Sequence, residues 1–193
     1  MKDTSSTYDA ILDVAQGLVI AGGFNGFSYA DIADAVGIRK ASIHHHFPSK
    51  ADLVLALVDR YRLRAEAGLN ALREKTSAPI EQLTIYINFW QTCILDSSAP
   101  FCVCAVLAGE MQMLPTEAAA SVRAHFTNLS AWLTSVLRDG VEQKQFFLTN
   151  SADEEAQILV ACVHGAMLSA RAFNDPEVFG AIVRPQISRL LAT

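Results

Sequence analysis

Apolar residues recur at intervals of three and four along nearly the whole chain, which is the spacing of an α-helical face. The first such face is formed by Ile11, Leu12, Ala15, Leu18 and Val19. No segment alternates apolar and polar residues for long enough to predict a strand, and only residues 146–148 are ambiguous. The sequence therefore predicts an all-α chain of about nine helices.

Glycine and proline divide this pattern into segments. Near the N-terminus the first helix stops at Gly22-Gly23, a short one covers 29–36, and a third covers 40–47 before Pro48. A long helix, opened by the Ser49 and Asp52 pair, follows over about 50–75. Later helices are predicted beyond Pro79 up to a break at 96–100, over 102–113, from Pro115 to Gly140, from about Asp153, and from Pro176. Pro185 is expected to kink or divide the last one.

Composition excludes several classes of protein. Of the 193 residues, 51% are hydrophobic and 18% are charged, which excludes a disordered chain. The longest apolar stretch, 101–109, has about half the length that a membrane span needs, and the first six residues are polar. We therefore expect a cytoplasmic protein with no membrane partner, in which the four cysteines are reduced.

The charge is unevenly distributed. The formal net charge is −5, yet residues 39–50 hold three bases, three histidines and no acid. A second basic stretch follows, with Arg60, Arg62, Arg64, Arg73 and Lys75. A total charge thus does not describe the N-terminal third, where a basic surface for nucleic acid is expected.

The three short N-terminal segments predict a helix-turn-helix. In that motif the helix over 29–36 supports the helix over 40–47, and Gly37 supplies a turn that needs positive φ. The spacing of Ala33, Val36, Ile38, Ile43 and Phe47 allows the two helices to pack against the first helix. The polar residues left for DNA include Arg39, Lys40, Ser42, His44 and His45.

Residues 27–53, from Phe27-Ser28-Tyr29 to Ala51-Asp52-Leu53, resemble the N-terminal domain of TetR/AcrR-type transcriptional regulators. The resemblance covers about 8–60, and Asp31-Ile32-Ala33, Val36-Gly37-Ile38, His46-Phe47 and Lys50 fall in register. One departure is His44, where the family usually has a tyrosine that touches a phosphate. The remaining residues match only in helical pattern and length.

This resemblance implies a DNA-binding domain over 1–50, a connecting helix over 50–75, and an effector-binding and dimerisation domain over 76–193. It also implies a homodimer on a palindromic operator of double-stranded DNA, with reading heads roughly 34–36 Å apart. The most favoured function is a repressor that a small apolar or amphipathic effector releases from DNA. An effector acts by preferring one of two conformations.

Each predicted DNA contact follows from what the side chain can do. Lys50 would meet a phosphate at the start of the long helix, and Ser28 would cap a helix, donate to a phosphate, or both. Arg39 and Lys40 could read guanine edges or bind the backbone, and Ser42 and His45 are the favoured base-proximal pair. A metal site at 44–46 is disfavoured because successive helical residues diverge by roughly 100°.

Two further sets of residues are assigned to the C-terminal part. Related regulators dimerise through their last two helices, so the resemblance implies a dimer surface there. Its small and apolar residues would be Cys162, Gly165, Met167, Leu168, Ser169, Ala172, Ile182, Gln186 and Ile187. Aromatic residues with a few polar groups would bind the effector: Tyr86, Phe89, Trp90, Cys102, Glu110, Met111, Phe126, Trp132 and His164. An ordinary helical core remains an alternative for both sets.

A second regulator hypothesis is a thiol-based sensor of oxidants or electrophiles. Cys102 is expected at a helix start, where the dipole would lower the pKa of a thiol. Cys102 and Cys104 would point roughly 200° apart on one helix, which disfavours a zinc site. No phosphate-binding loop or catalytic motif is found, so neither an enzyme nor a cofactor is predicted.

Overall fold

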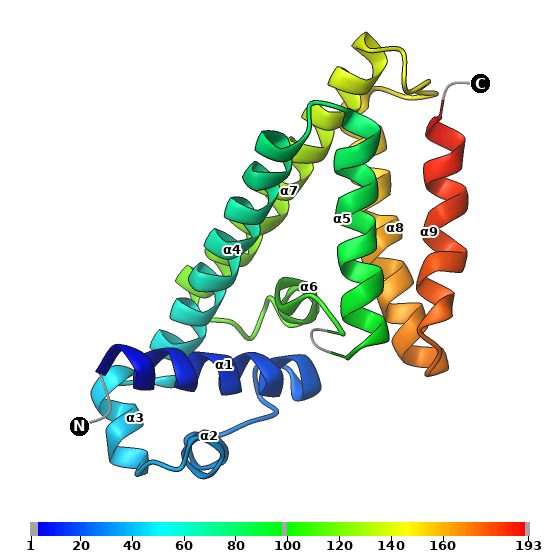
Figure 1. Ribbon diagram of the computed structural model, residues 1–193. Coiled ribbons are helices and arrows are strands. Elements are labelled where there is room, and N and C mark those ends of the chain that lie inside the picture. Colours follow the sequence, from blue (N-terminus) through cyan, green and yellow to red (C-terminus); the bar gives the residue numbers. More distant parts are fainter. Residues whose placement is uncertain (1–3, 98–99, 192–193) are drawn as a thin grey trace. The chain divides into compact units, whose positions relative to one another are not determined.

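The computed structural model describes residues 4–97 and 100–191, so residues 1–3, 98–99 and 192–193 lie outside the described part. Within that part the regular elements are nine α-helices, which confirms the all-α prediction (Figure 1). They are α1 (Thr4–Gly22), α2 (Tyr29–Val36), α3 (Lys40–His46), α4 (Lys50–Lys75), α5 (Pro79–Leu95), α6 (Val103–Ala108), α7 (Thr116–Glu142), α8 (Ala152–Phe173) and α9 (Glu177–Leu190).

The chain forms two compact units. The first contains Met1–Arg64 and Cys102–His125, and the second contains Ala65–Phe101 and Phe126–Thr193. The first unit thus joins α1, α2 and α3 to α6, although 37 residues separate its two segments in the sequence. Only α4 and α7 contribute residues to both units. The α6 segment therefore belongs with the N-terminal helices.

Local chemistry sets the ends of the helices in the first unit. Ser28 caps α2, because its hydroxyl accepts from the backbone N–H of Asp31 while the Asp31 carboxylate accepts from the N–H of Ser28. Gly37 ends α2 with φ of 72°, a left-handed conformation that glycine adopts without strain. The predicted bounds of α2 are confirmed, and α3 ends one residue before the predicted Phe47.

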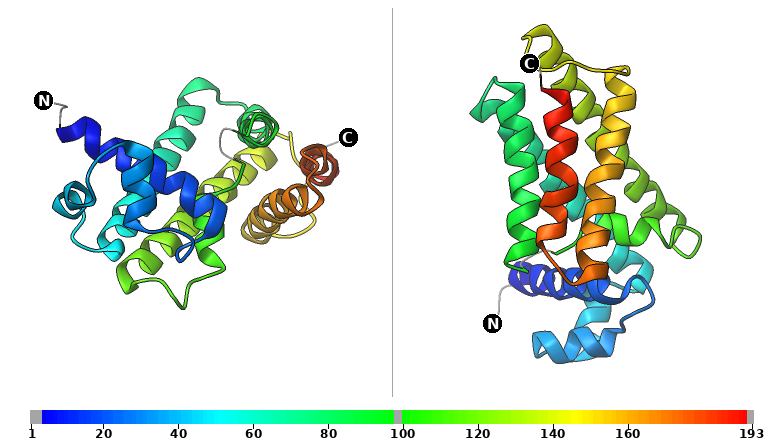
Figure 2. Two further views of the ribbon diagram at one scale, coloured as in Figure 1. Left: turned by 90° about the horizontal axis from the view of Figure 1, so that it is seen from below. Right: turned by 90° about the vertical axis from the view of Figure 1, so that its right-hand side faces the viewer.

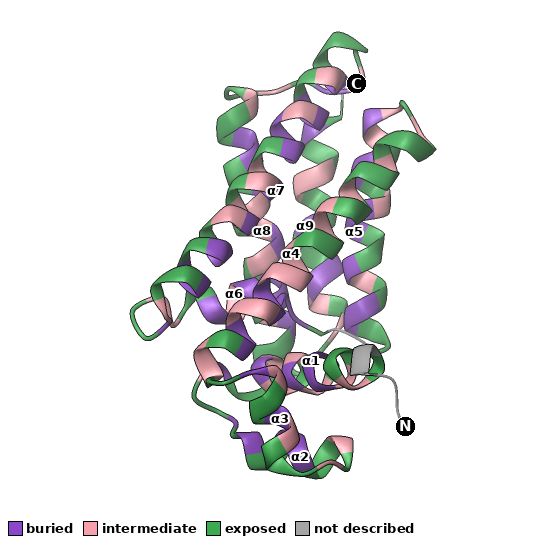
Figure 3. Cartoon of the chain, turned by 90° about the vertical axis from the view of Figure 1, so that its left-hand side faces the viewer, coloured by how far each residue is buried: buried purple, intermediate pink, exposed green. Residues whose placement is uncertain are grey.

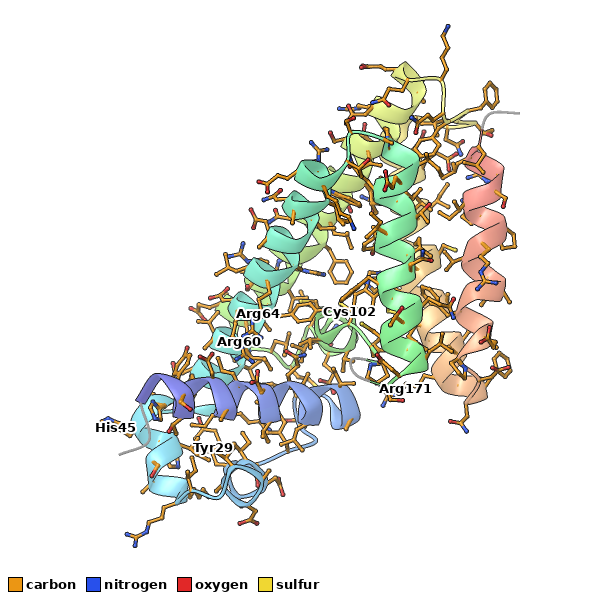
Figure 4. All side chains as sticks on the ribbon, viewed as in Figure 1. Tyr29, His45, Arg60, Arg64, Cys102 and Arg171 are labelled. Carbon is orange, nitrogen blue, oxygen red and sulfur yellow. The ribbon has the colours of Figure 1, made fainter. Side chains whose placement is uncertain are left out.

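Ion pairs join α1 to α4 inside the first unit. Arg60 donates to Asp9 at 3.1 Å and to Asp13 at 2.7 Å, and Arg64 lies 3.9 Å from Asp13 (Figure 4). Part of the second basic stretch is therefore neutralised by the acids of α1.

In the second unit, α8 and α9 lie side by side as an antiparallel pair (Figures 1 and 2). A fully buried carboxylate, that of Glu155 in α8, forms an ion pair with Arg189 near the end of α9 and accepts from Asn150 at 2.9 Å. The backbone N–H of Phe147 donates to Leu190 at 2.8 Å, so the ambiguous residues 146–148 form only an isolated bridge with the end of α9.

Two predicted helix ends were wrong. The helix predicted over 102–113 is α6, which stops at Ala108 and is followed by turns. The α7 helix passes through Gly140, which is glycine because a Cβ there would lie 2.0 Å from the Phe146 ring. Of the two outcomes expected at Pro185, division of the last helix did not occur: α9 continues through Pro185, which is exposed, and the carbonyl that it leaves unpaired lies on exposed Ala181.

The Glu155 and Arg189 ion pair predicts how stability depends on pH. The Arg189 side chain lowers the pKa of Glu155 in the folded state. The ion pair therefore contributes its full stability above the pKa of an unfolded glutamate, about 4.3, and this stability is lost as the pH falls through the lower pKa of the folded state. Arg189→Ala leaves a buried carboxylate without its cation, and we expect the free energy of unfolding to fall by about 3 kcal/mol at neutral pH. Urea titration measures it, with Arg184→Ala, an exposed arginine of the same helix, as the control. Equal losses in both variants would contradict the prediction.

Candidate functional site

The α2–α3 pair is held together by one buried hydrogen bond. The Tyr29 hydroxyl donates to the backbone oxygen of Phe47 at 2.9 Å. Burial, and then the charge of Asp52, raise the pKa of Tyr29 to about 12, so the hydroxyl stays protonated and remains a donor. Ile43 is fully buried and fixes the inner face of α3. The outer face of α3 is thereby set at a defined angle to α2.

That outer face carries the residues predicted to contact DNA. Arg39, Lys40, His44 and His45 are exposed, and Ser42 is half-buried. Figure 3 shows exposed residues along α3. Figure 4 shows His45 pointing away from the packed helices. The structure thus brings these five side chains to one short helix and its N-cap, and their contacts with DNA remain predictions.

The three consecutive histidines have different surroundings. The His44 ring packs 4.7 Å from the Tyr29 ring, and its Nδ1 lies 3.3 Å from the Pro48 oxygen. The His46 ring instead lies 6.1 Å from the ring of Tyr8 on α1. His44 and His45 are exposed despite these contacts, whereas His46 is half-buried.

Lys50 occupies an aromatic and carbonyl site at the start of α4. Its ammonium donates to the Phe27 oxygen at 2.5 Å and lies 4.1 Å from the Phe27 ring centre and 5.2 Å from that of Phe24. Burial lowers the pKa of Lys50, while the charges of Asp31 and Glu110 oppose that shift. The half-buried ammonium is thus held in one place beside α2.

Ser28 is exposed and serves as the N-cap of α2. Its hydroxyl also donates to Asp31 at 2.8 Å, and this hydroxyl and the backbone donors lower the pKa of Asp31. The capping role is therefore confirmed, and a phosphate contact by the same hydroxyl stays a prediction.

The residues predicted to bind an effector are divided between the two units. In the first unit are Cys102, Glu110 and Met111; in the second are Tyr86, Phe89, Trp90, Phe126, Trp132 and His164. Within the second, the Tyr86 and Trp132 rings lie 5.6 Å apart and the Phe126 and His164 rings 5.2 Å apart. Phe89 is 56% exposed, so it lies on the surface of α5.

Cys102 is not inside a helix. It is the extended N-cap of α6, with ψ of 122°, and its fully buried Sγ lies 3.8 Å from Nε2 of His125. The premise that Cys102 and Cys104 diverge on one helix was therefore wrong: the two thiols interact, and this contact with burial raises the pKa of Cys104.

Most residues predicted for a dimer surface are on the outside of α8 and α9. Gly165, Leu168, Ala172 and Ile182 are exposed, whereas Met167 is fully buried within the chain. The others are half-buried: Cys162, Ser169, Gln186 and Ile187.

We call the region from α1 to the start of α4 the reading head. Sequence reasoning did not identify three residues that shape it. Tyr29 and Phe24 were not assigned roles, and Glu110 was assigned only to effector binding, yet its carboxylate accepts from the Phe24 N–H at 2.6 Å. The Ser28 and Asp31 spacing is a sequence signal that could have revealed the full capping box. No local pattern signals the contact between Phe24 and Glu110, which are 86 positions apart.

Comparison with known families and structures agrees with this geometry. Residues 11–57 match the family model described as bacterial regulatory proteins, tetR family, and residues 79–184 match a tetracyclin repressor-like C-terminal domain. A transcriptional regulator of the TetR family from Agrobacterium tumefaciens is 54% identical, covers 98% of this chain and 100% of its own, and superposes with a TM-score of 0.96. A comparison with curated proteins found no match.

Two other solved structures share the fold. A TetR transcriptional regulator from Legionella pneumophila is 27% identical over 98% of both chains, with a TM-score of 0.86. The reduced form of E. coli NemR is 20% identical, covers 97% of this chain and 98% of its own, and has a TM-score of 0.83. At that identity the likeness to NemR shows the fold alone.

The two exposed histidines of α3 predict that their side chains contribute to DNA affinity. An imidazole N–H can donate a hydrogen bond to a phosphate or to a base edge. We expect His44→Ala and His45→Ala each to weaken binding of a labelled duplex, which fluorescence anisotropy measures.

The matched control is His46→Ala, which should retain wild-type DNA affinity because the His46 ring faces Tyr8. Wild-type affinity in the variant lacking both His44 and His45 would remove them from the interface.

Proposed function

Because the chain belongs to the TetR family of transcriptional regulators, we propose that it is a homodimeric repressor that a small-molecule effector releases from a palindromic operator. The observation that carries this proposal is the outer face of α3, where Arg39, Lys40, His44 and His45 are all exposed. A short, exposed, cationic helix supported by a second helix is the geometry that enters a major groove.

The proposed division of labour follows the sequence: residues 1–50 read DNA, 50–75 connect, and 76–193 bind the effector and the second subunit. Ser42 and His45 are the proposed base-proximal pair, because they are on α3 between its charged N-cap and Phe47. Lys50 and Ser28 are proposed phosphate contacts, and Arg39 and Lys40 bind either bases or backbone.

For the dimer we propose the α8 and α9 face. Ile158, Cys162, Gly165, Ser169 and Ala172 follow one another at helical spacing, and none of them is buried. Small residues allow a close approach of a partner helix, and exposed Leu168 and Ile182 add apolar area. This face also accounts for the apolarity of α8. By length and composition alone α8 could cross a membrane, and 39% of its apolar 18-residue stretch is buried within the chain. Since DNA is the proposed partner, we place the protein in the cytoplasm.

For the effector we propose a molecule that has a hydrogen-bond acceptor and an apolar or aromatic body. Trp132 is buried, and no described residue accepts a hydrogen bond from its Nε1. A buried donor without a partner costs about 1–3 kcal/mol, which an acceptor on a ligand would recover. The Tyr86 ring, 5.6 Å from that of Trp132, adds an aromatic surface for the body of the ligand.

A thiol route through Cys102 is the alternative, and burial weighs against it. The Cys102 thiol is fully enclosed, so a reagent would meet it only after the surrounding helices open. The neighbouring Cys104 has a raised pKa, which reduces its thiolate fraction. Ligand binding therefore remains the favoured route of release.

The DNA-binding proposal is tested with a duplex selected from a random library by the wild-type protein. We expect a palindromic consensus. Lys50→Ala should weaken binding to this duplex and to random duplex alike, and lower the salt slope by about one, because it removes one phosphate contact. Ser42→Ala and His45→Gln should instead change which bases are selected.

Glu117→Ala, an exposed acid of α7, is the control and should leave both quantities unchanged. Failure to select any sequence at low salt would reject DNA reading, and an unchanged slope in Lys50→Ala would reject its phosphate contact.

The effector proposal is tested by a thermal-shift screen of small metabolites, followed by titration of each ligand found. Trp132→Phe keeps the ring and removes the N–H donor, so ligand affinity should fall roughly tenfold. Phe147→Leu, at an exposed position that is not among the predicted effector-binding residues, should leave affinity unchanged. Equal affinity of wild type and Trp132→Phe would exclude the Trp132 donor from the effector site.

A further inference from the structure

The turn after α1 depends on a carboxylate from a distant part of the sequence. The α1 helix ends at Gly22, and the next residue, Gly23, is buried with φ of 72°. The N–H of Phe24 then donates to Oε2 of Glu110 at 2.6 Å. A Cβ at Gly23 would lie 2.3 Å from Oε1 of Glu110, so glycine there makes room for the carboxylate. The turn and Glu110 are therefore fitted to each other.

A second contact joins the same two segments. Nδ2 of Asn25 lies 3.9 Å from the Met113 sulfur, so residues of the turn meet both ends of the stretch 110–113. A Cβ at Gly26 would lie 2.2 Å from the Gly22 oxygen, which shows how tightly the turn is closed. All these residues belong to the first unit. The stretch that follows α6 is thus a support for the α1–α2 turn.

Two residues of the α1–α2 turn, Phe24 and Phe27, contact the Lys50 ammonium. The rings of Phe24 and Phe27 lie 5.2 and 4.1 Å from the Lys50 ammonium, and the Phe27 oxygen accepts from it at 2.5 Å. Glu110 also acts on Lys50 through its negative charge. A hydrogen bond to the Phe24 backbone fixes the ring that forms one wall of the lysine site, so Glu110 and Lys50 are linked through Phe24.

We propose that Glu110 is a positioning residue of the reading head, which through the Phe24 backbone holds the turn that directs the Lys50 ammonium toward a DNA phosphate. This inference rests on the proposed phosphate contact of Lys50. It assigns to Glu110 a role in DNA binding that needs no contact with DNA. The acceptor oxygen of Glu110 is the part that matters for the turn, and its charge is secondary.

Three substitutions at Glu110 separate these features. Glu110→Ala removes the acceptor, and Glu110→Asp keeps the charge but is one methylene shorter, so its carboxylate is withdrawn from Phe24. Both should weaken binding of the selected duplex roughly threefold to tenfold and lower the salt slope by about one, as expected for the loss of one phosphate contact. Glu110→Gln keeps an acceptor of the same length and should retain the wild-type slope.

The control is the Glu117→Ala variant, which should retain wild-type affinity and slope. The double variant Glu110→Ala/Lys50→Ala should bind no more weakly than Lys50→Ala, because the contact of Lys50 is already lost. Thermal unfolding of each variant identifies any that fails to fold. If Glu110→Ala does not fold, Glu110→Asp provides the test.

The outcomes separate this inference from the proposed function. If the wild type selects no duplex, or if Lys50→Ala keeps the wild-type slope, the phosphate contact itself fails. If Lys50→Ala lowers the slope but folded Glu110→Asp does not, or if the two losses add in full in the double variant, Glu110 does not position Lys50 and the inference is overturned.

Discussion

The N–H groups that follow the end of α1 must find acceptors in a closed turn, and for Phe24 that acceptor is the Glu110 carboxylate. The position of α2 depends on this turn, because the capped start of α2 follows it directly. The position of α3 depends in turn on α2 through the hydrogen bond from Tyr29 to Phe47. The reading head is therefore a series of short elements, each fixed by one or two directed hydrogen bonds on an apolar base.

Charge in the first unit is distributed by the same packing. Arg60 and Arg64 are basic residues of α4, but they pair with acids of α1 and so stabilise the unit. The permanent positive charges among the proposed DNA-contacting residues are then those of Arg39, Lys40 and Lys50. So few cations per head make a weak electrostatic contribution, since each phosphate contact adds only a modest factor. Pairing two heads in a dimer is consistent with this shortage and with a net charge of −5.

Helices were predictable from sequence wherever their signals are local. The bounds of α2 follow from Ser28 and Gly37, which act within a few residues, and the start of α4 follows from the Ser49 and Asp52 pair. The end of α7 was missed because Gly140 makes room for the Phe146 ring, a tertiary demand that resembles a helix stop in sequence.

Site geometry was less predictable, because it arises from contacts between distant segments. The spacing of Cys102 and Cys104 was interpreted on a helix, but Cys102 is the extended cap before it, so the two thiols meet. The side chains of the reading helix were identifiable from a local motif, whereas the environment of Lys50 requires Phe24, Phe27 and Glu110 to be brought together by folding. Local chemistry thus predicts which groups face DNA, and tertiary packing determines how they are held.

The high share of hydrophobic residues, 51%, is explained in part by the two apolar faces of α8. Met167 and Val163 of α8 are buried within the chain, while Leu168 on the same helix is 59% exposed. One helix therefore has an inner apolar face that packs in the second unit and an outer face of small and apolar residues. An outer face of this kind costs free energy in water unless another surface covers it. A second copy of the same face would cover it with matching small residues, so the proposed dimer would bring two reading heads together and bury the outer face of α8 in one association.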